Sequence, residues 1–317
     1  MILFIADIHI KLEQKNVPIK WAIDRYNRFF NIIYDLEKEV DTIIIGGDIF
    51  DKNPTLEELC IFTNFISKLS TSTIIYDGNH EATKKYETFF KYLKDILEKV
   101  NPLVKVHYQT KEFDNYSILP YAELHKPNSI ETLNFSKPLF THVRGEIPPH
   151  VKSEVDLNRF NKFPVVFAGD LHSHSNTQRN IVYPGSPMTI TFHRKEVKTG
   201  GLLIDENTWE WKWVEFKLPQ LIRKTISNPE EMIQTEFNHT IYELQGDVVD
   251  LSNIKNSELL DKKITTQSSE ATLILGKDMT VQEELYEYLM YIQELSENKV
   301  KNIIGVYNDY NKGTLLE

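Results

Sequence analysis

The feature that most constrains the fold is a repeated arrangement in which a short apolar run ends directly in polar residues. The first run, Ile2–Ala6, is followed by Asp7 and His9. The later sets, each after an apolar run, are Gly47-Asp48, Gly78-Asn79-His80, Thr141-His142 and Gly169-Asp170-Leu171-His172. Apolar runs of this length that are bounded by glycine or polar residues are typical of buried strands. The sequence therefore predicts that these polar side chains lie at strand ends.

Helical and strand patterns alternate in the first part of the chain. The strands expected there are Ile2–Ala6, Thr42–Ile45, Thr73–Tyr76 and Val104–His107. Between them we expect helices over about residues 18–38, from a capping-box pattern at Thr55 and Glu58 to about Leu69, and over about residues 86–100. Strands that alternate with helices are parallel and joined by right-handed crossovers. Their carboxyl ends then share one edge of the sheet, where open α/β sheets bind ligands.

Beyond Val104 the pattern changes to short strands. They are expected at Ser117–Leu119, Pro138–Thr141, Val165–Ala168, Ile181–Tyr183, Gly201–Ile204 and Trp209–Phe216. The large aromatic residues of the last segment alternate at strand spacing, which is typical of a half-buried strand face. We therefore predict a mixed α/β (α+β) fold for residues 1–217, in which two packed β-sheets form a sandwich flanked by helices.

A change of character near residues 217–220 predicts a domain boundary. Residues 218–278 are expected to form a small α/β capping module, with strands at Ile222–Ile226, Thr240–Leu244 and Ala271–Leu275. Residues 279–317 are expected to form a helical segment, because Thr280 and Glu283 make a second capping-box pattern before an amphipathic series. The apolar members of that series are Val281, Leu285, Leu289, Ile292 and Leu295.

The composition of the chain indicates its cellular compartment and the kind of partner it needs. The 317 residues are 41% hydrophobic, and no run approaches the roughly 18 apolar residues of a membrane span. Cys60 is the single cysteine, so no internal disulfide forms, which favours the cytoplasm; we interpret Cys60 as a small core residue. The formal net charge of −10 is unusual for a nucleic-acid-binding protein, so a partner is expected to supply positive surface if the substrate is DNA.

The polar sets contain ligand types that suit metal ions. Asp7 and His9 are two residues apart and can bind one ion from the same side, while the Asp48 carboxylate is free to bridge two ions. Asn79 offers a neutral oxygen and His142 an imidazole. Each residue alone is read more simply as a polar loop or turn residue. Five such sets at strand ends together predict a centre with two metal ions for phosphoester hydrolysis.

Further positions complete the candidate site. His80 is expected to face the substrate and to act as a general acid for the leaving oxygen. Asp51 has two interpretations, a cap for the following helix or a group that orients a ligand. The last motif has two-residue ligand spacing twice, as Asp170/His172 and as His172/His174.

The order of these motifs resembles that of the calcineurin-like metallophosphoesterase superfamily. Its pattern is Asp-x-His, Gly-Asp-x-x-[Asp or His], Gly-Asn-His-[Asp or Glu], a strand-end His and Gly-His-x-His, and the resemblance spans about residues 1–215. Within it, the chain is most similar to the nuclease subunit of SbcCD/MR-type DNA-break-processing complexes, especially the shorter bacteriophage recombination endonuclease subunits. Residues 47–54, residues 183–187 and the extra module after about residue 217 carry this closer likeness.

The resemblance implies ligand roles. Asp7 and His9 would bind the first metal, and Asp48 would bridge both ions. Asn79 and His142 would bind the second metal. The family prefers Mn²⁺, and the same mixture of carboxylate, amide and imidazole ligands also accepts Mg²⁺, Fe²⁺ or Zn²⁺.

The resemblance leaves the last motif open. The superfamily usually has His directly after the glycine, where this chain has Asp170. Aligned on Gly169, Asp170 takes the second metal and His172 the first; aligned on the histidines, His172 and His174 take those places. We favour the glycine alignment, because the glycine marks the strand end.

The resemblance also implies catalytic groups and partners. His80 matches the histidine that contacts the scissile phosphate and protonates the leaving group, and Asp51 stands where some members have a second histidine. The implied partners are DNA, an SbcC-type ABC ATPase subunit and a second copy of the chain, in the cytoplasm of a bacterium or phage-infected host. The alternatives are a calcineurin-like phosphodiesterase or phosphatase that acts on a small or protein phosphoester, and a non-catalytic scaffold.

Overall fold

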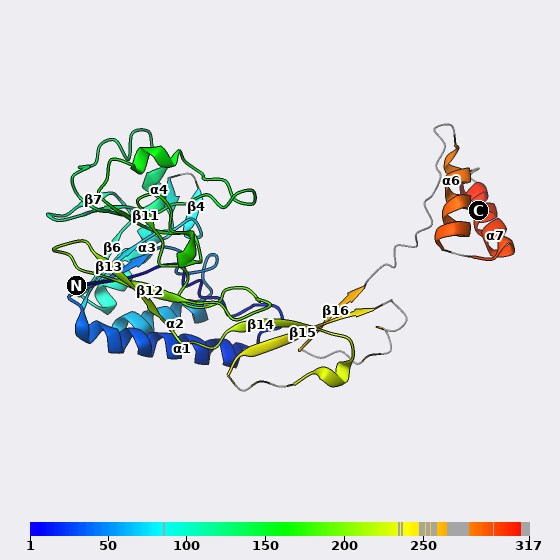
Figure 1. Ribbon diagram of the computed structural model, residues 1–317, viewed down its shortest axis with the longest axis horizontal. Coiled ribbons are helices and arrows are strands. Elements are labelled where there is room, and N and C mark those ends of the chain that lie inside the picture. Colours follow the sequence, from blue (N-terminus) through cyan, green and yellow to red (C-terminus); the bar gives the residue numbers. More distant parts are fainter. Residues whose placement is uncertain are drawn as a thin grey trace. The chain divides into compact units, whose positions relative to one another are not determined.

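The computed structural model of the chain (Figure 1) describes residues 1–84, 86–233, 235, 237–246, 251, 254, 259–264, 279–293 and 295–311. The chain divides into two units, Met1–Leu244 with Asn256–Asp261 and Gln245–Lys255 with Lys262–Glu317. None of the helices in the described ranges combines enough length with enough apolar character to cross a lipid bilayer.

Six strands form the first sheet, in the order β13-β12-β1-β2-β3-β6. Their bounds are β1 Ile2–Ile5, β2 Thr42–Gly46, β3 Ser72–Tyr76, β6 Val104–His107, β12 Gly200–Ile204 and β13 Trp211–Glu215. The strands β1, β2, β3 and β6 are parallel, whereas β12 and β13 pair antiparallel. The connecting helices are α1 (Ile19–Leu36), a 3₁₀ turn (Glu37–Glu39), α2 (Leu56–Ser67) and α3 (Phe90–Val100). The predicted alternation of parallel strands and helices is confirmed.

The second sheet has the order β11-β10-β9-β8-β7. Its strands are β7 Lys111–Glu112, β8 Ser117–Leu119, β9 Leu139–His142, β10 Val166–Gly169 and β11 Ile181–Val182. β8 to β11 run parallel, and β7 pairs antiparallel with β8. The short helices between these strands are α4 (Tyr121–Leu124), η2 (Leu157–Phe160) and η3 (His174–Asn176).

The period-two alternation along β1 divides its side chains between two cores. Leu3 and Ile5 are buried with apolar residues of α1, α2 and α3. Ile2 and Phe4 face the opposite way, into the space between the sheets, where Phe140 lies edge-on to Phe4 with ring centroids 5.3 Å apart. Figure 1 shows the layers: α1 and α2 lie along one side of the first sheet, and the second sheet lies on the other. The predicted two-sheet sandwich flanked by helices is confirmed.

The structure differs from the prediction between β3 and α3. The helix expected from Tyr86 begins at Phe90, and the preceding residues form a hairpin of β4 (Ala82–Lys84) and β5 (Glu87–Thr88). Tyr86 has a φ of 67°, a left-handed conformation through which a right-handed helix cannot run. Trp209 also has a positive φ of 62°, and β13 begins two residues later, at Trp211.

The interpretation of Cys60 as a core residue was wrong. Its side chain is exposed on α2. The buried residues of that helix include Glu58 and Phe62, and Thr55 caps it in the predicted capping box with Glu58. Cys60 is two positions from both Glu58 and Phe62. In a helix with about 3.6 residues per turn it therefore lies on the side opposite to these buried residues.

The region after residue 220 forms a sheet of its own, in the order β14-β15-β16. Its strands are β14 Leu221–Ile226, β15 His239–Gly246 and β16 Leu260–Ile264, with a 3₁₀ turn at Pro229–Glu231. The first two match predicted strands, and the predicted strand Ala271–Leu275 lies outside the described residues. The domain boundaries at residues 217 and 278 stay a prediction.

In the described part of the chain after residue 279, two helices are present rather than one. Thr280 caps the first in the predicted capping box with Glu283, and α6 (Val281–Glu287) continues into a π-helical turn (Tyr288–Ile292). The second helix, α7 (Glu297–Asn311), lies within the segment 279–317 that was predicted to be helical, but a separate helix was not specified there. Its sequence offers only a short buried apolar stripe, Val300 and Ile304, which packs with Leu289.

Candidate metal centre

The carboxyl ends of five strands bring the predicted ligands together. β1, β2 and β3 are neighbours in the first sheet, and β9 and β10 are neighbours in the second. Three groups of side chains have ligand atoms that lie within 4.8 Å of one another. The groups are Asp7, His9 and His172; His9, Asp48 and His80; and Asp7, Asp48 and His142. Because the groups share members, they form one continuous cluster.

Two glycines allow the loops after β2 and β3 to approach each other. Gly47 has a φ of +85°, and a Cβ there would lie 2.6 Å from the Gly78 nitrogen. A Cβ on Gly78 would lie 2.2 Å from Asp48 Oδ1. Positive φ angles also occur at four candidate ligands: Asp7 (58°), His9 (49°), Asp48 (50°) and Asp170 (102°). Backbone strain that clusters in this way is typical of functional sites.

The first half of the cluster, which we call the His9 group, consists of Asp7, His9 and His172. The Nε2 atoms of His9 and His172 lie 3.2 Å apart, a separation at which the facing nitrogens need a proton or a cation between them. Burial, followed by the charge of His9, lowers the pKa of His172 to about 4. The His172 imidazole is therefore neutral near pH 7 and keeps a lone pair for a ligand.

The carboxylate of Asp51 lies next to the Nδ1 atom of His9. Its Oδ1 lies 3.6 Å from His9 Nδ1, and its Oδ2 lies 2.6 Å from Lys11 Nζ. The contact with His9, aided by Lys11, outweighs burial and lowers the pKa of the Asp51 carboxyl. A carboxylate at Nδ1 leaves Nε2 to point into the cluster, as at metal-binding histidines. The helix α2 is capped by Thr55, so this geometry matches the interpretation of Asp51 as an orienting group.

The second half, which we call the Asn79 group, consists of Asp48, Asn79, His142 and Asp170. The amide atom assigned as the Asn79 oxygen lies 3.1 Å from Asp48 Oδ2 and 3.2 Å from Asp170 Oδ1. It also lies 3.0 Å from His142 Nε2, while His142 Nδ1 donates to the Gly46 carbonyl oxygen at 2.9 Å. Turning the amide over would supply two N–H donors for three acceptors. A cation would instead satisfy all four groups, with Asn79 as an oxygen ligand.

Buried charge in the cluster also favours a cation. Burial, reinforced by the charges of Asp48 and Asp170, raises the pKa of Asp7 well above its usual value. Burial opposes a charge on His142, but the neighbouring carboxylates outweigh it and raise its pKa. At Asp48, burial is outweighed by the surrounding imidazoles, which lower the pKa. Carboxylates held close together in a low dielectric need positive charge, which divalent metal ions supply, so the donor set fits such ions.

His80 is held differently from the other histidines. Its Nδ1 lies 2.5 Å from the carbonyl oxygen of Asp51, and its backbone N–H donates to Asp48 Oδ1 at 2.9 Å. Its Nε2 lies 3.9 Å from Asp48 Oδ2, and its side chain is 36% exposed. The ring therefore stands at the edge of the cluster, where it lines a cavity.

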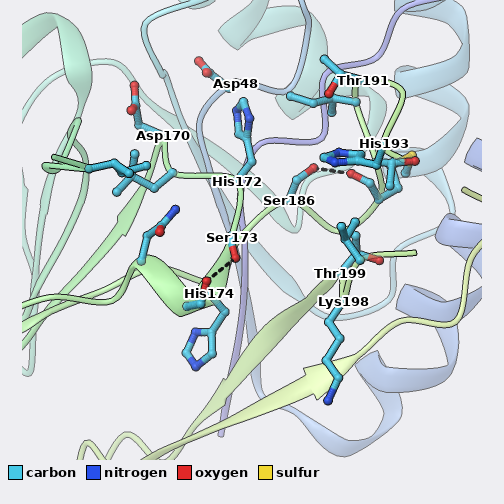
Figure 2. Close-up of a pocket in the computed structure, with 18 of the residues that line it drawn as sticks. Asp48, Asp170, His172, Ser173, His174, Ser186, Thr191, His193, Lys198 and Thr199 are labelled. Atoms are coloured by element: carbon cyan, nitrogen blue, oxygen red, sulfur yellow. Dashed lines mark hydrogen bonds between the residues drawn. The ribbon is translucent and has the colours of Figure 1, made fainter. Parts of the chain in front are cut away.

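That cavity has a volume of about 880 Å³. Figure 2 shows Asp48, Asp170 and His172 on one side of it and Thr191, His193 and Lys198 on the other. The lining also includes the cation Arg144. The candidate ligands thus border a space that has positive charge in its walls.

His174 takes no part in the cluster. Its Nδ1 lies 2.6 Å from the carbonyl oxygen of Tyr183, and its ring stacks on Trp213 with centroids 5.7 Å apart. Figure 2 shows the rings of His172 and His174 pointing in opposite directions. The structure therefore brings Asp170 and His172 to the other ligands, but not His174.

Sequence reasoning assigned no role to Glu81, although it belongs to the Gly78–Glu81 motif. Its buried carboxylate accepts the backbone N–H groups of Asp48 at 2.8 Å, Phe50 at 3.0 Å and Gly78 at 2.8 Å. Burial and then the charge of Asp48 raise the pKa of Glu81 to about 7. Glu81 thereby ties the loop after β2 to the loop after β3. Its position directly after Asn79-His80 was the available signal.

Sequence reasoning also missed Arg144. Its Nε lies 3.3 Å from Asp170 Oδ2 and its Nη2 lies 3.3 Å from Asp170 Oδ1, a two-pronged pair. Asp170 in turn is the residue that departs from the superfamily pattern. The only signal in the sequence was that Arg144 lies two residues after His142.

Comparisons with known proteins agree with this geometry. The model of the calcineurin-like phosphoesterase family matches residues 1–174, a segment that contains every candidate ligand. The chain is 39% identical over 328 residues to "Probable exonuclease subunit 1" of Escherichia phage T5, which covers 98% of this chain and 99% of that protein. It is 24% identical over 362 residues to "DNA double-strand break repair protein Mre11" of Sulfurisphaera tokodaii, covering 97% and 92% of the two chains.

The chain therefore belongs to the calcineurin-like phosphoesterase family, and with it to the metal-dependent hydrolases of phosphoester bonds. The likeness to a phage exonuclease subunit and to Mre11 confirms the closer resemblance inferred from the motifs. A non-catalytic scaffold is the weakest of the alternatives, because the chain keeps six residues of the family's site: Asp7, His9, Asp48, Asn79, His80 and His142.

Proposed function

We propose that the chain is the nuclease subunit of a complex that processes DNA ends, and that it hydrolyses DNA phosphodiesters with two divalent metal ions. The observation that carries this proposal is the pair of ligand groups that meet at Asp48, in the wall of the cavity of about 880 Å³. Relatives aligned over nearly the whole chain support DNA as the substrate, since one is named an exonuclease subunit and another a DNA double-strand break repair protein.

In this proposal each half of the cluster holds one ion. Asp7, His9 and His172 would bind the first, Asn79, His142 and Asp170 would bind the second, and Asp48 would bind both. The contact of Asp170 with the Asn79 amide supports the glycine alignment, and so does the packing of His174 on Trp213. The mixture of carboxylate, amide and imidazole ligands suits Mn²⁺.

When bound, the two ions would supply an activated water and would offset the charge of the phosphate. The chain itself supplies orientation and a proton. The Asp51 carboxylate lies next to Nδ1 of His9, and its carbonyl oxygen fixes the ring of His80 through Nδ1. The protonated Nε2 of His80 then donates to the leaving sugar oxygen as the phosphorus–oxygen bond breaks and the water oxygen bonds to phosphorus.

Partners would complete the DNA-binding surface. The net charge of −10 argues against strong binding of duplex DNA by the chain alone, so we propose that an ABC-type ATPase subunit contributes positive surface. The two C-terminal helices, α6 and α7, are the segment proposed to dock on it. Deletion of residues 280–317 is expected to abolish co-purification with the ATPase while cleavage of single strands continues; unchanged complex formation would refute the docking role.

A second copy of the chain is the other proposed partner. Three apolar side chains at helical spacing on α3 are exposed: Tyr92 at 72%, Ile96 at 50% and Val100 at 40%. Exposed apolar residues that gather on one helix face are typical of an interaction surface. We propose that this face of α3 supports a homodimer, which Ile96→Lys should convert to a monomer in light scattering.

The central experiment is Mn²⁺-dependent degradation of end-labelled linear duplex and single-stranded DNA by the wild type and by His80→Ala. Loss of the positioned acid is expected to lower the rate about 10²- to 10⁴-fold. Metal content should not change, because His80 Nε2 is the ring nitrogen at the edge of the cluster. His150→Ala, at an exposed histidine outside the cavity lining, is the matched control and should cut DNA like the wild type.

The same assay separates the alternatives. If neither protein cuts DNA, even with the ATPase present, but the wild type hydrolyses bis-p-nitrophenyl phosphate, the small-phosphodiester function takes precedence. If the wild type cuts neither, the enzymatic proposal fails.

A further inference from the structure

A second cavity adjoins the Asn79 group. Its volume is about 450 Å³, and it is lined by Asn79, Ala82, Lys84, Tyr86, Tyr121, Ala122 and His125. Asn79 is the residue that its lining shares with the larger cavity. The amide of a candidate metal ligand therefore stands between two spaces of unequal size. We call the smaller space the Tyr121 pocket.

The walls of the Tyr121 pocket come from the β4–β5 hairpin and from α4. Tyr121 is fixed at both ends, because its backbone N–H donates to the Asp77 carbonyl oxygen at 3.2 Å and its hydroxyl donates to Glu154 Oε2 at 3.0 Å. Its ring lies edge-on to His125, with centroids 4.8 Å apart, and edge-on to His142, with centroids 6.1 Å apart. An immobilised aromatic ring thus stands next to a candidate ligand of the second metal.

The opposite wall is more exposed and carries positive charge. Tyr86, at the turn of the hairpin, is 36% exposed, and Lys84 is exposed beside it. Among the described residues that line the pocket, none is acidic. This distinguishes it from the larger cavity, whose lining includes Asp48 and Asp170.

Size and chemistry point to one occupant. Ligand pockets for small molecules measure roughly 300–1,000 Å³. A pocket of about 450 Å³ lies at the lower end, suited to a single nucleoside, whereas the larger cavity is about twice that size. Nucleobases of any sequence stack on aromatic side chains, and cations of Lys contact their phosphates. Two tyrosines, a histidine and a lysine beside a metal centre match these requirements.

We infer that the Tyr121 pocket holds the terminal nucleotide of a DNA strand, on one side of the scissile phosphate, while the rest of the strand occupies the larger cavity. The inference rests on the proposed nuclease function and deepens it. Cleavage with one nucleoside in the small pocket releases a deoxynucleoside monophosphate. Tyr86 and Tyr121 contact the base or sugar, and Lys84 contacts the phosphate.

The test is titration calorimetry of the full chain, loaded with Mn²⁺, with dAMP and with deoxyribose 5-phosphate, which lacks the base. Tyr86→Ala is expected to weaken dAMP binding at least about fivefold, the lower limit for loss of one stacking contact, and to leave deoxyribose 5-phosphate binding unchanged. Lys84→Ala should weaken both. Tyr86→Phe keeps the ring and should bind dAMP like the wild type. Tyr288→Ala, at an exposed tyrosine of α6 and its π-helical turn, is the matched control.

A kinetic measurement keeps failure of this inference separate from failure of the nuclease proposal. With bis-p-nitrophenyl phosphate as substrate, dAMP should inhibit the wild type, and Tyr86→Ala should raise the inhibition constant by the same factor. If the wild type cuts DNA but Tyr86→Ala and Lys84→Ala bind dAMP like the wild type, the pocket is refuted and the nuclease stands. If dAMP binding depends on Tyr86 but DNA is not cut, the nucleotide site stands and the nuclease proposal falls.

Discussion

The two halves of the metal centre hold their candidate ligands in place by different interactions. In the His9 group, the side chain of Asp51 contacts a ligand ring, and the imidazole of His172, which faces His9, is kept neutral near pH 7 by burial. In the Asn79 group, the backbone carbonyl of Gly46 orients the ring of His142, and a carboxylate, Asp170, is balanced by an arginine. The comparison indicates that metal binding depends mainly on the placement of imidazole rings in the His9 group. In the Asn79 group it depends mainly on the balance of charge.

Among the metal ligands, the largest effect is expected where the halves meet, at Asp48. Its Oδ2 lies 3.6 Å from His9 Nε2 and 3.4 Å from His142 Nε2, so it serves both groups. Asp48→Asn keeps the shape and removes the charge. DNA cleavage should fall on the order of 10³-fold, the equivalent of several kcal/mol of transition-state stabilisation, and both ions should be lost in metal analysis. Asp24→Asn, at an exposed site on α1, is the control; retention of one tightly bound ion would show that the halves act independently.

A second comparison concerns the two histidines of the last motif. His172→Ala removes a ring that faces His9, so we expect a loss of activity of about 10²-fold and release of the first ion. His174→Ala removes a ring that stacks on Trp213, and cleavage should stay within about fivefold of the wild type. Metal content and cleavage rates of the two variants check this. Equal losses would support the alternative alignment, in which both histidines are ligands.

The charge balance of the Asn79 group can be tested by replacing Arg144 and Asp170 singly and together. Arg144→Met leaves Asp170 without its arginine partner. Metal affinity should fall about 10- to 100-fold, the usual effect of removing a group that holds a ligand. Asp170→His removes the negative charge that Arg144 balances. The double variant should therefore recover to within about tenfold of the wild type. Calorimetry of Mn²⁺ binding across the cycle gives the coupling, and purely additive losses would mean that the pair is not a unit.

The last prediction concerns stability rather than activity, at Asp77 beneath the Asn79 group. Burial raises the pKa of Asp77 from 3.8 to about 8, while its Oδ2 accepts the Ala122 N–H at 2.9 Å. Because the folded state keeps a proton that the unfolded state releases, Asp77 lowers stability progressively as the pH rises from about 4 to 8. Asn at position 77 does not titrate. The free energy of unfolding of Asp77→Asn should therefore rise relative to that of the wild type by up to about 1.4 kcal/mol per pH unit in that window. Urea unfolding in chelator at pH 5 and pH 8 measures this; an equal difference at both values would contradict it.

Much of the fold follows from local patterns. The alternation of apolar runs and helical faces correctly located β1 to β3, the helices α1 and α2, and most strands of the second sheet. The errors came where a single residue overrides the pattern, as at Tyr86, whose left-handed backbone ends the apparent helix and creates a hairpin. That hairpin forms a wall of the Tyr121 pocket, which is why sequence reasoning did not find the pocket.

The sequence by itself determined the ligand types and their positions, because each set directly follows an apolar run and a strand must end there. Only the tertiary structure decided which side chains meet. His9 and His172 are 163 residues apart and face each other, while His174, two residues from His172, turns away to Trp213. Arg144 and Glu81 likewise acquire their roles through contacts between loops of different strands. The physical reason is that periodicity records the environment of each residue along the chain, whereas metal coordination and charge balance depend on distances across it.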